Sequence, residues 1–73
     1  MSEKQIAIMG SLDTISQIKA LGPMIKLNPK KYNALAAQLQ KLLNDVGLHV
    51  RIDGYAGKIT SDAYFAVSGK RLL

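Results

Sequence analysis

The sequence predicts an all-α fold, a small three-helix bundle whose last two helices are joined by a loop of the form DGxxG. Three observations support this fold class. Apolar residues recur every three or four positions in three separate segments, a glycine follows each segment, and 73 residues are enough for one domain only. We therefore expect a single domain over residues 1–73, with residues 1–10 as an N-terminal segment in which residues 5–9 form either a strand or an extension of the first helix.

The first helix is expected over residues 11–21. Ser11 is a suitable N-cap, and Gly22 followed by Pro23 ends the helical pattern. Its apolar face would consist of Leu12, Ile15, Ile18 and Leu21.

The second helix has the strongest pattern. Asn28 is a natural N-cap, Pro29 is suited to the first helical position, and Gly47 follows the last apolar residue. Residues spaced by three and four form one apolar stripe, which we expect in the core: Tyr32, Leu35, Ala36, Leu39, Leu42, Leu43 and Val46.

The third helix is expected to begin at the cap Thr60 and to end at Gly69. Tyr64 and Phe65 are adjacent and cannot share a face, so Tyr64 is expected inside and Phe65 exposed. Before this helix, Leu48, Val50 and Ile52 belong to an extended connector that fills the core. The glycines of the loop, Gly54 and Gly57, would both permit a positive φ.

Charge and composition limit the function classes. The net charge of +5 favours a polyanionic partner, but the lysines are scattered, which argues against a nucleic-acid-binding face. No apolar run approaches the roughly 20 residues of a membrane span. The first residues do not read as a secretory signal, so synthesis in the cytoplasm is expected.

Catalytic and metal-binding patterns are missing. His49 is the only histidine and there is no cysteine, so no set of three convergent metal ligands emerges and no cofactor is implied. Asp53 lacks a second carboxylate placed for hydrolysis of a glycosidic bond. We expect no enzyme, and a His49 that faces solvent.

A set of motif residues runs through the second half of the chain. In order, these residues are Leu39, Gln40, Leu43 and Gly47, then Asp53, Gly54, Gly57 and Thr60, then Ala63 and Tyr64. This pattern resembles the peptidoglycan-binding-domain-like family, small helical modules of cell-wall hydrolases and phage endolysins, over about residues 35–67. The chain departs from the family pattern at Ala56, where an aromatic is usual, and at Val67-Ser68, where the family has Phe-Gln.

The resemblance implies a helix-loop-helix over residues 35–69 and a non-catalytic module that binds peptidoglycan. Its implied ligand-binding residues are Gln40, Asp53, Gly54, Tyr55, Gly57, Lys58, Thr60 and Tyr64. For Gln40, a bond to the loop backbone is preferred over direct contact with a glycan. The implied setting is the cell wall, reached after lysis or as part of a virion. The alternative is a small protein-interaction module on the same fold, such as an inhibitor, an assembly factor or a virion component.

Overall fold

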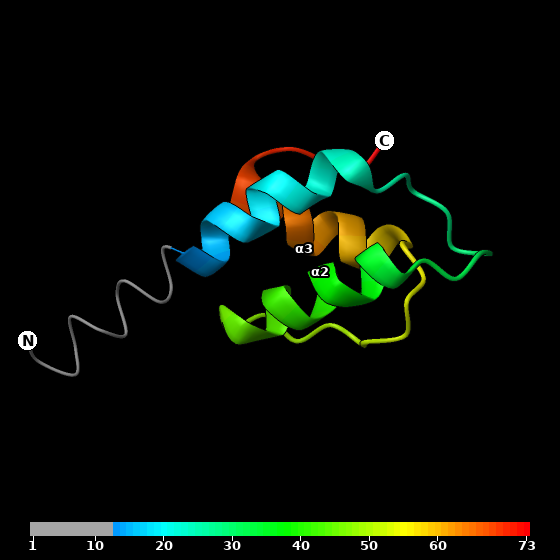
Figure 1. Cartoon of the computed structure of the whole chain (residues 1–73), viewed down its shortest axis with the longest axis horizontal. Helices are drawn as coiled ribbons and strands as arrows, with labels where there is room; N and C mark the ends of the chain where they lie inside the picture. The colour runs from blue at the N-terminus through cyan, green and yellow to red at the C-terminus, as the bar shows by residue number, and fades with distance from the viewer. Residues whose placement is uncertain (1–12) are drawn as a thin grey trace, which may run out of the picture.

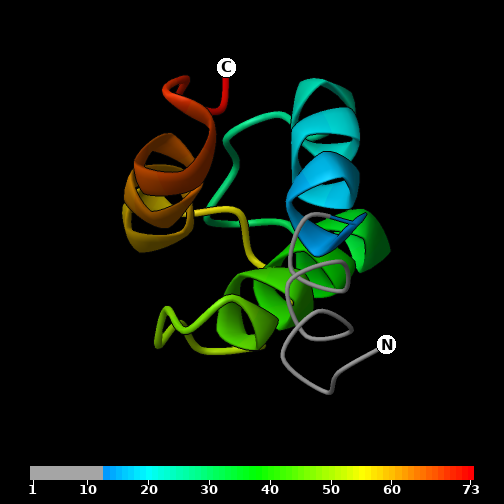
Figure 2. The same cartoon turned by 90° about the vertical axis from the view of Figure 1, so that its left-hand side faces the viewer.

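The computed structural model describes residues 13–73, and over this range it confirms the all-α three-helix bundle. The N-terminal helix is described over residues 13–21 and leads into a short 3-10 helix, η1 (Gly22–Met24). The helix α2 spans Ala34–Asp45, and α3 spans Lys58–Ser68. Seen end-on, the three helices lie at the corners of a triangle (Figures 1 and 2). The expectations for residues 1–10, Ser11 and Leu12 lie outside the described residues.

The core draws on all three helices, both connections and the C-terminal tail. The buried apolar residues are Ile18, Ile25, Ala36, Leu39, Leu43, Ala56, Tyr64 and Leu72. The middle of the predicted α2 stripe is confirmed, because Ala36, Leu39 and Leu43 are completely inaccessible to solvent. Burying each leucine stabilises the fold by about 1.5–3 kcal/mol, so this stripe is the main apolar contribution of α2.

The prediction for the start of α2 is wrong. The helix begins at Ala34, and its N-cap is Asn33, whose Oδ1 accepts the backbone N–H of Leu35 at 2.9 Å. The backbone N–H of Asn28 instead donates to the carbonyl of Ala56 at 2.9 Å, in an isolated antiparallel bridge. This tertiary bond holds residue 28 against the loop before α3, so the helical path starts five residues later.

Because the helix starts late, Tyr32 lies outside it and is 60% exposed, so its predicted place in the core is wrong. The predicted end of α2 agrees with the structure. Gly47 has a φ of +101°, and the Leu48 N–H reaches back to the carbonyl of Leu43 at 3.1 Å. In the connector that follows, Leu48 and Val50 are partly buried against the core, but Ile52 is 54% exposed, contrary to expectation.

The predicted start of α3 is also wrong. The first helical residue is Lys58, and the N-cap is Gly57, whose carbonyl accepts the N–H of Ser61 at 3.0 Å. Thr60 is already helical and buried. Gly57 has a φ of −91°, so only Gly54, at +79°, takes the positive φ expected of the loop glycines.

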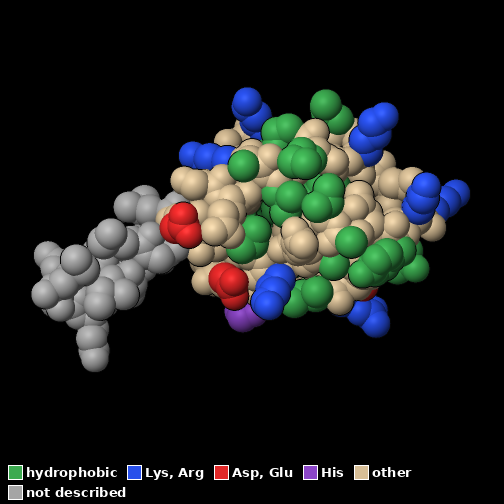
Figure 3. Space-filling model, viewed as in Figure 1, with side chains coloured by type: hydrophobic (Ala, Val, Ile, Leu, Met, Phe, Trp, Pro, Cys, Tyr) green, Lys and Arg blue, Asp and Glu red, His purple; other side chains and the backbone are tan. Residues whose placement is uncertain are grey.

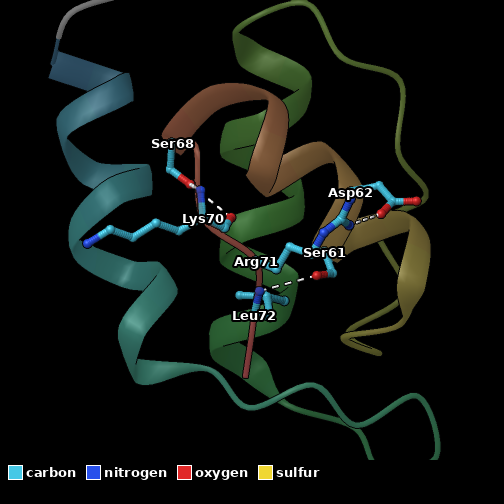
Figure 4. Close-up of polar contacts among 6 residues, drawn as sticks. All are labelled: Ser61, Asp62, Ser68, Lys70, Arg71 and Leu72. Atoms are coloured by element: carbon cyan, nitrogen blue, oxygen red, sulfur yellow. Dashed lines mark hydrogen bonds and ion pairs between the residues drawn. The ribbon is translucent and has the colours of Figure 1, made fainter.

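The end of α3 and the tail agree better with expectation. Gly69 ends the helix with a φ of +78°, Tyr64 is 3% exposed and Phe65 is 45% exposed. The tail then runs back along α3, where the backbone N–H of Leu72 donates to Ser61 Oγ at 3.2 Å (Figure 4). This bond helps to hold the buried Leu72 side chain in the core.

Two exposed contacts accompany the tail. Arg71 forms an ion pair with Asp62 (Figure 4). Its guanidinium also lies over the Phe65 ring, 4.7 Å from the ring centre. Each exposed contact of this kind stabilises by at most about 1 kcal/mol. They secure the tail less than the buried Leu72 does.

Candidate functional site

The centre of the candidate site is one buried side chain, Gln40, which makes five hydrogen bonds to the loop and to α3. Its Oε1 accepts the backbone N–H groups of Asp53 at 3.0 Å and Gly54 at 2.9 Å. Its Nε2 lies 3.0, 3.1 and 3.0 Å from three acceptors, Asp53 Oδ1, the Tyr55 carbonyl and Thr60 Oγ1, among which its two N–H groups are shared. The expectation that Gln40 bonds the loop backbone is confirmed.

Two asparagines of the same helix region extend this network. The backbone N–H of Asn33 donates to the Gly54 carbonyl at 2.7 Å. The side-chain amide of Asn44 makes two hydrogen bonds to the backbone of Val50. Its Nδ2 donates to the Val50 carbonyl at 2.8 Å, and its Oδ1 accepts the Val50 N–H at 3.2 Å. Three residues of α2 and its cap therefore fix the connector and the loop along one side of the helix.

No buried side-chain nitrogen or oxygen within residues 13–73 lacks a hydrogen-bond partner, and those of Gln40 and Thr60 are paired within the network. An unmet buried group would cost about 1–3 kcal/mol, so a fully bonded network of this kind rigidifies the loop. The loop is thus held in one conformation without a ligand, which favours binding because little ordering is left to be done.

Asp53 is the one carboxylate of this network. Its Oδ1 accepts the backbone N–H of Tyr55 at 3.0 Å as well as the Gln40 amide. These two hydrogen bonds, the first being the stronger influence, lower the pKa of Asp53 below its ordinary value of 3.8. The group stays ionised at neutral pH and serves to order the turn.

The loop and the start of α3 border an open depression of about 580 Å³, which we call the loop groove. Six of the predicted site residues line it: Gln40, Asp53, Tyr55, Gly57, Lys58 and Thr60. The structure therefore brings most of the predicted set together.

Two predicted site residues lie elsewhere. Gly54 is buried beneath the Tyr32 ring, where an added Cβ would lie 2.2 Å from the ring atom Cε1. Tyr64 is buried against Gly22 and the tail, and it borders a different depression. Within this structure Gly54 shapes the loop and Tyr64 belongs to the core.

Sequence reasoning missed four residues of the groove: Pro29, His49, Arg51 and Ile59. Pro29 and Ile59 lie next to the predicted helix starts, so they were assigned to helix ends and not to a groove. In the structure Ile59 is 72% exposed, which is unusual for an isoleucine. His49 and Arg51 alternate along the connector with Leu48 and Val50, which pack against the core. This alternation could have predicted that His49 and Arg51 share one outward face. His49 is exposed, as expected, but it faces the groove.

The lining of the loop groove suits a polar, anionic ligand with an apolar or ring-shaped part. Arg51 and Lys58 supply positive charge that outweighs the single lining carboxylate, Asp53, whose Oδ1 accepts the Tyr55 N–H and the Gln40 amide. Tyr55 is 41% exposed and is steadied by an edge contact with Tyr32, with 6.2 Å between ring centroids. A tyrosine held in this way can stack on a sugar ring or bond a peptide through its hydroxyl.

The described residues contain neither a metal-binding group of three acidic, histidine or cysteine side chains nor a helix long and apolar enough to cross a membrane. The fold and the groove together define a small three-helix bundle with an open groove beside the loop before α3. No protein-family model matches the chain, and neither a curated protein nor a solved structure matches it.

Proposed function

We propose that the chain is a non-catalytic module that binds the bacterial cell wall, holding a peptide stem or glycan of peptidoglycan in the loop groove. One observation carries the proposal. Four residues that bear the family resemblance, Gln40, Asp53, Gly54 and Thr60, meet in a single hydrogen-bond network directly beneath the groove. Their spacing in the sequence therefore corresponds to a physical unit, which supports the resemblance and its implied site.

The groove would bind such a ligand through two kinds of contact. The Tyr55 ring offers an apolar face and a hydroxyl, and Arg51 with Lys58 attracts the carboxylates of stem peptides. Because the groove is open, we expect modest affinity for one unit. On this proposal the module acts at the wall after lysis or as part of a virion.

The test is co-sedimentation of the purified chain with peptidoglycan sacculi at low and moderate salt. Tyr55→Ala should weaken retention about tenfold or more, the loss expected for a central aromatic contact. Phe65→Ala is the matched control, because Phe65 has a similar exposure of 45% and lies outside the groove. Retention that survives only at low salt would indicate charge attraction without a groove.

A lack of any retention would refute the wall-binding proposal. Equal losses from Tyr55→Ala and Phe65→Ala would refute the assignment of the groove. Circular dichroism of both variants separates lost binding from lost folding, since the edge contact of Tyr55 with Tyr32 is worth only about 0.5–1.5 kcal/mol.

A second candidate, a protein-interaction module, is favoured by a different surface. Hydrophobic side chains gather over the seam between the N-terminal helix and α2, with Lys and Arg side chains around the rim of this view (Figure 3). A shallow depression there is bordered by Ala20, Leu21, Met24 and Leu42, and Met24 is 65% exposed. Apolar patches on small proteins often mark protein contacts. A concentration-dependent dimer that Met24→Lys abolishes would support this function.

A further inference from the structure

A second depression adjoins the loop groove. It has a volume of about 370 Å³, and we call it the lysine groove because Lys26 and Lys31 both border it. Asn28, Tyr32, Asn33, Ala34 and Ala56 complete its lining. None of the residues predicted from the sequence as ligand-binding belongs to it.

The two grooves lie on either side of one shared ridge. The ridge is the backbone bridge between Asn28 and Ala56, whose N–H and carbonyl are 2.9 Å apart. Asn28 and Ala56 border the lysine groove, whereas their chain neighbours Pro29 and Gly57 border the loop groove. Consecutive residues on both sides of the bridge therefore border the two grooves.

Two exposed aromatic rings lie between the two grooves. Tyr32 borders the lysine groove and Tyr55 borders the loop groove, and the rings meet edge to face with an interplanar angle of 84°. They are 60% and 41% exposed. The pair presents apolar surface, on which sugar rings can stack, next to both grooves.

The combined surface of the two grooves is mainly positive. Lys26 and Lys31 stand on one side of the ridge, and Arg51 and Lys58 on the other. Among the residues that line the two grooves, Asp53 is the only acidic one, and its Oδ1 is already bonded by Tyr55 and Gln40. The surface is therefore complementary to a ligand with anionic groups in two separate places.

We infer that, given the proposed wall-binding function, the module holds an extended acidic glycopeptide across both grooves, with the carboxylates of successive units facing the two pairs of cationic side chains. A single unit occupies the loop groove alone. The lysine groove adds affinity only when the ligand carries a second unit, because the second contact is then made within one complex.

The experiment measures binding of soluble wall fragments to the whole chain by isothermal titration calorimetry. The probes are a single disaccharide-peptide unit and an uncrosslinked glycan chain of several such units. The test variant is the double substitution Lys26→Ala with Lys31→Ala. The control is Lys19→Ala with Lys41→Ala, which removes the same charge from two exposed lysines that line neither groove.

The test variant should lose about tenfold in affinity for the long chain, a change of about 1.4 kcal/mol, and should bind the single unit as the unchanged protein does. The control should bind both probes within about twofold of the unchanged protein. Equal losses in the two double variants, or a loss that the single unit shows as well, would overturn the two-groove inference while leaving the loop groove in place. Failure of the unchanged protein to bind either probe would instead overturn the wall-binding function itself, and the inference with it.

Discussion

Replacing Gln40 by methionine is the most direct test of how the loop is held. Methionine is close to glutamine in length and in helix propensity, so the substitution removes the five hydrogen bonds with little change in volume or in the stability of α2 itself. The loop groups that lose their partners include the backbone N–H groups of Asp53 and Gly54. No other side chain within the described residues is bonded to these two groups.

The size of the effect follows from those two N–H groups. The Gly54 N–H is buried and the Asp53 N–H partly buried, and a buried donor left unpaired costs about 1–3 kcal/mol. The bonds donated by the two N–H groups of Nε2 are lost as well. We expect the free energy of unfolding to fall by about 3 kcal/mol or more. A chain of 73 residues has a total stability of about 4–11 kcal/mol, so the variant should lose a large share of it.

The assay is urea unfolding followed by far-UV circular dichroism. With a slope of about 1 kcal/mol per molar urea, the midpoint should drop by about 3 M. Amide hydrogen exchange adds a local readout, since the Asp53 and Gly54 amides should be protected in the unchanged protein and exchange quickly in the variant. The matched control is Gln38→Met on the exposed side of α2, which should change stability by less than about 0.5 kcal/mol.

If Gln40→Met costs no more than Gln38→Met, the loop does not depend on Gln40 and the reasoning about the site is refuted. If stability falls but the two amides remain protected, the loop keeps its shape by other means. Either result would remove the link between the network and the groove.

Three further predictions test the electrostatics and the packing. The pKa of Asp53 is lowered on folding, so its stabilising effect is complete above about pH 4 and is lost as the pH falls through the lowered value. The unchanged protein should therefore lose stability between pH 5 and pH 2. Asp53→Asn should make this loss smaller, as measured by urea unfolding at each pH. Gly22→Ala would place a Cβ 2.0 Å from the buried Tyr64 ring and should lower stability by about 1–3 kcal/mol or more in thermal melts. The control is Gly57→Ala, whose Cβ would meet nothing closer than 3.5 Å and which should lower stability by less than about 1 kcal/mol. If Gly57→Ala lowered stability more than Gly22→Ala, the close contact between Gly22 and Tyr64 would be contradicted. Leu43→Ala should cost about 2–5 kcal/mol in urea unfolding, and a loss under 1 kcal/mol would show that this part of the core is loosely packed.

Most of the candidate site was accessible from the sequence because its residues are close together along the chain. Asp53, Gly57 and Thr60 belong to one turn, and a turn brings its own residues together whatever the rest of the fold does. Gln40 was placed beside them through the family resemblance, since residues 46–52 separate the end of α2 from the loop. The lysine groove was not predictable, since it depends on residues 26–34 packing against residue 56.

The errors in predicting helix ends come from tertiary contacts at Asn28 and Thr60, which are good caps by local chemistry. The Thr60 hydroxyl accepts a bond from Gln40, and the cap of α3 falls to Gly57. The Asn28 Oδ1 does accept the Lys30 N–H at 3.1 Å, as a cap would, but the Asn28 N–H pairs with the Ala56 carbonyl and α2 begins only after the cap Asn33. Capping contributes about 1 kcal/mol, which a tertiary contact readily outweighs.

The sequence by itself determined the number of helices expected in this chain, the apolar stripe of α2 and the glycines that end the helices. These features depend on helical periodicity and on local backbone conformation, which are the same in any fold. The family resemblance added the glutamine that holds the loop, whose partners are 13 to 20 residues away along the chain. The tertiary structure alone decided that Tyr32 is exposed, that the buried Tyr64 lies away from the loop groove, and that two cationic grooves meet at one ridge. Those outcomes depend on how distant segments pack, because a side chain is buried or exposed only by what the rest of the chain places against it.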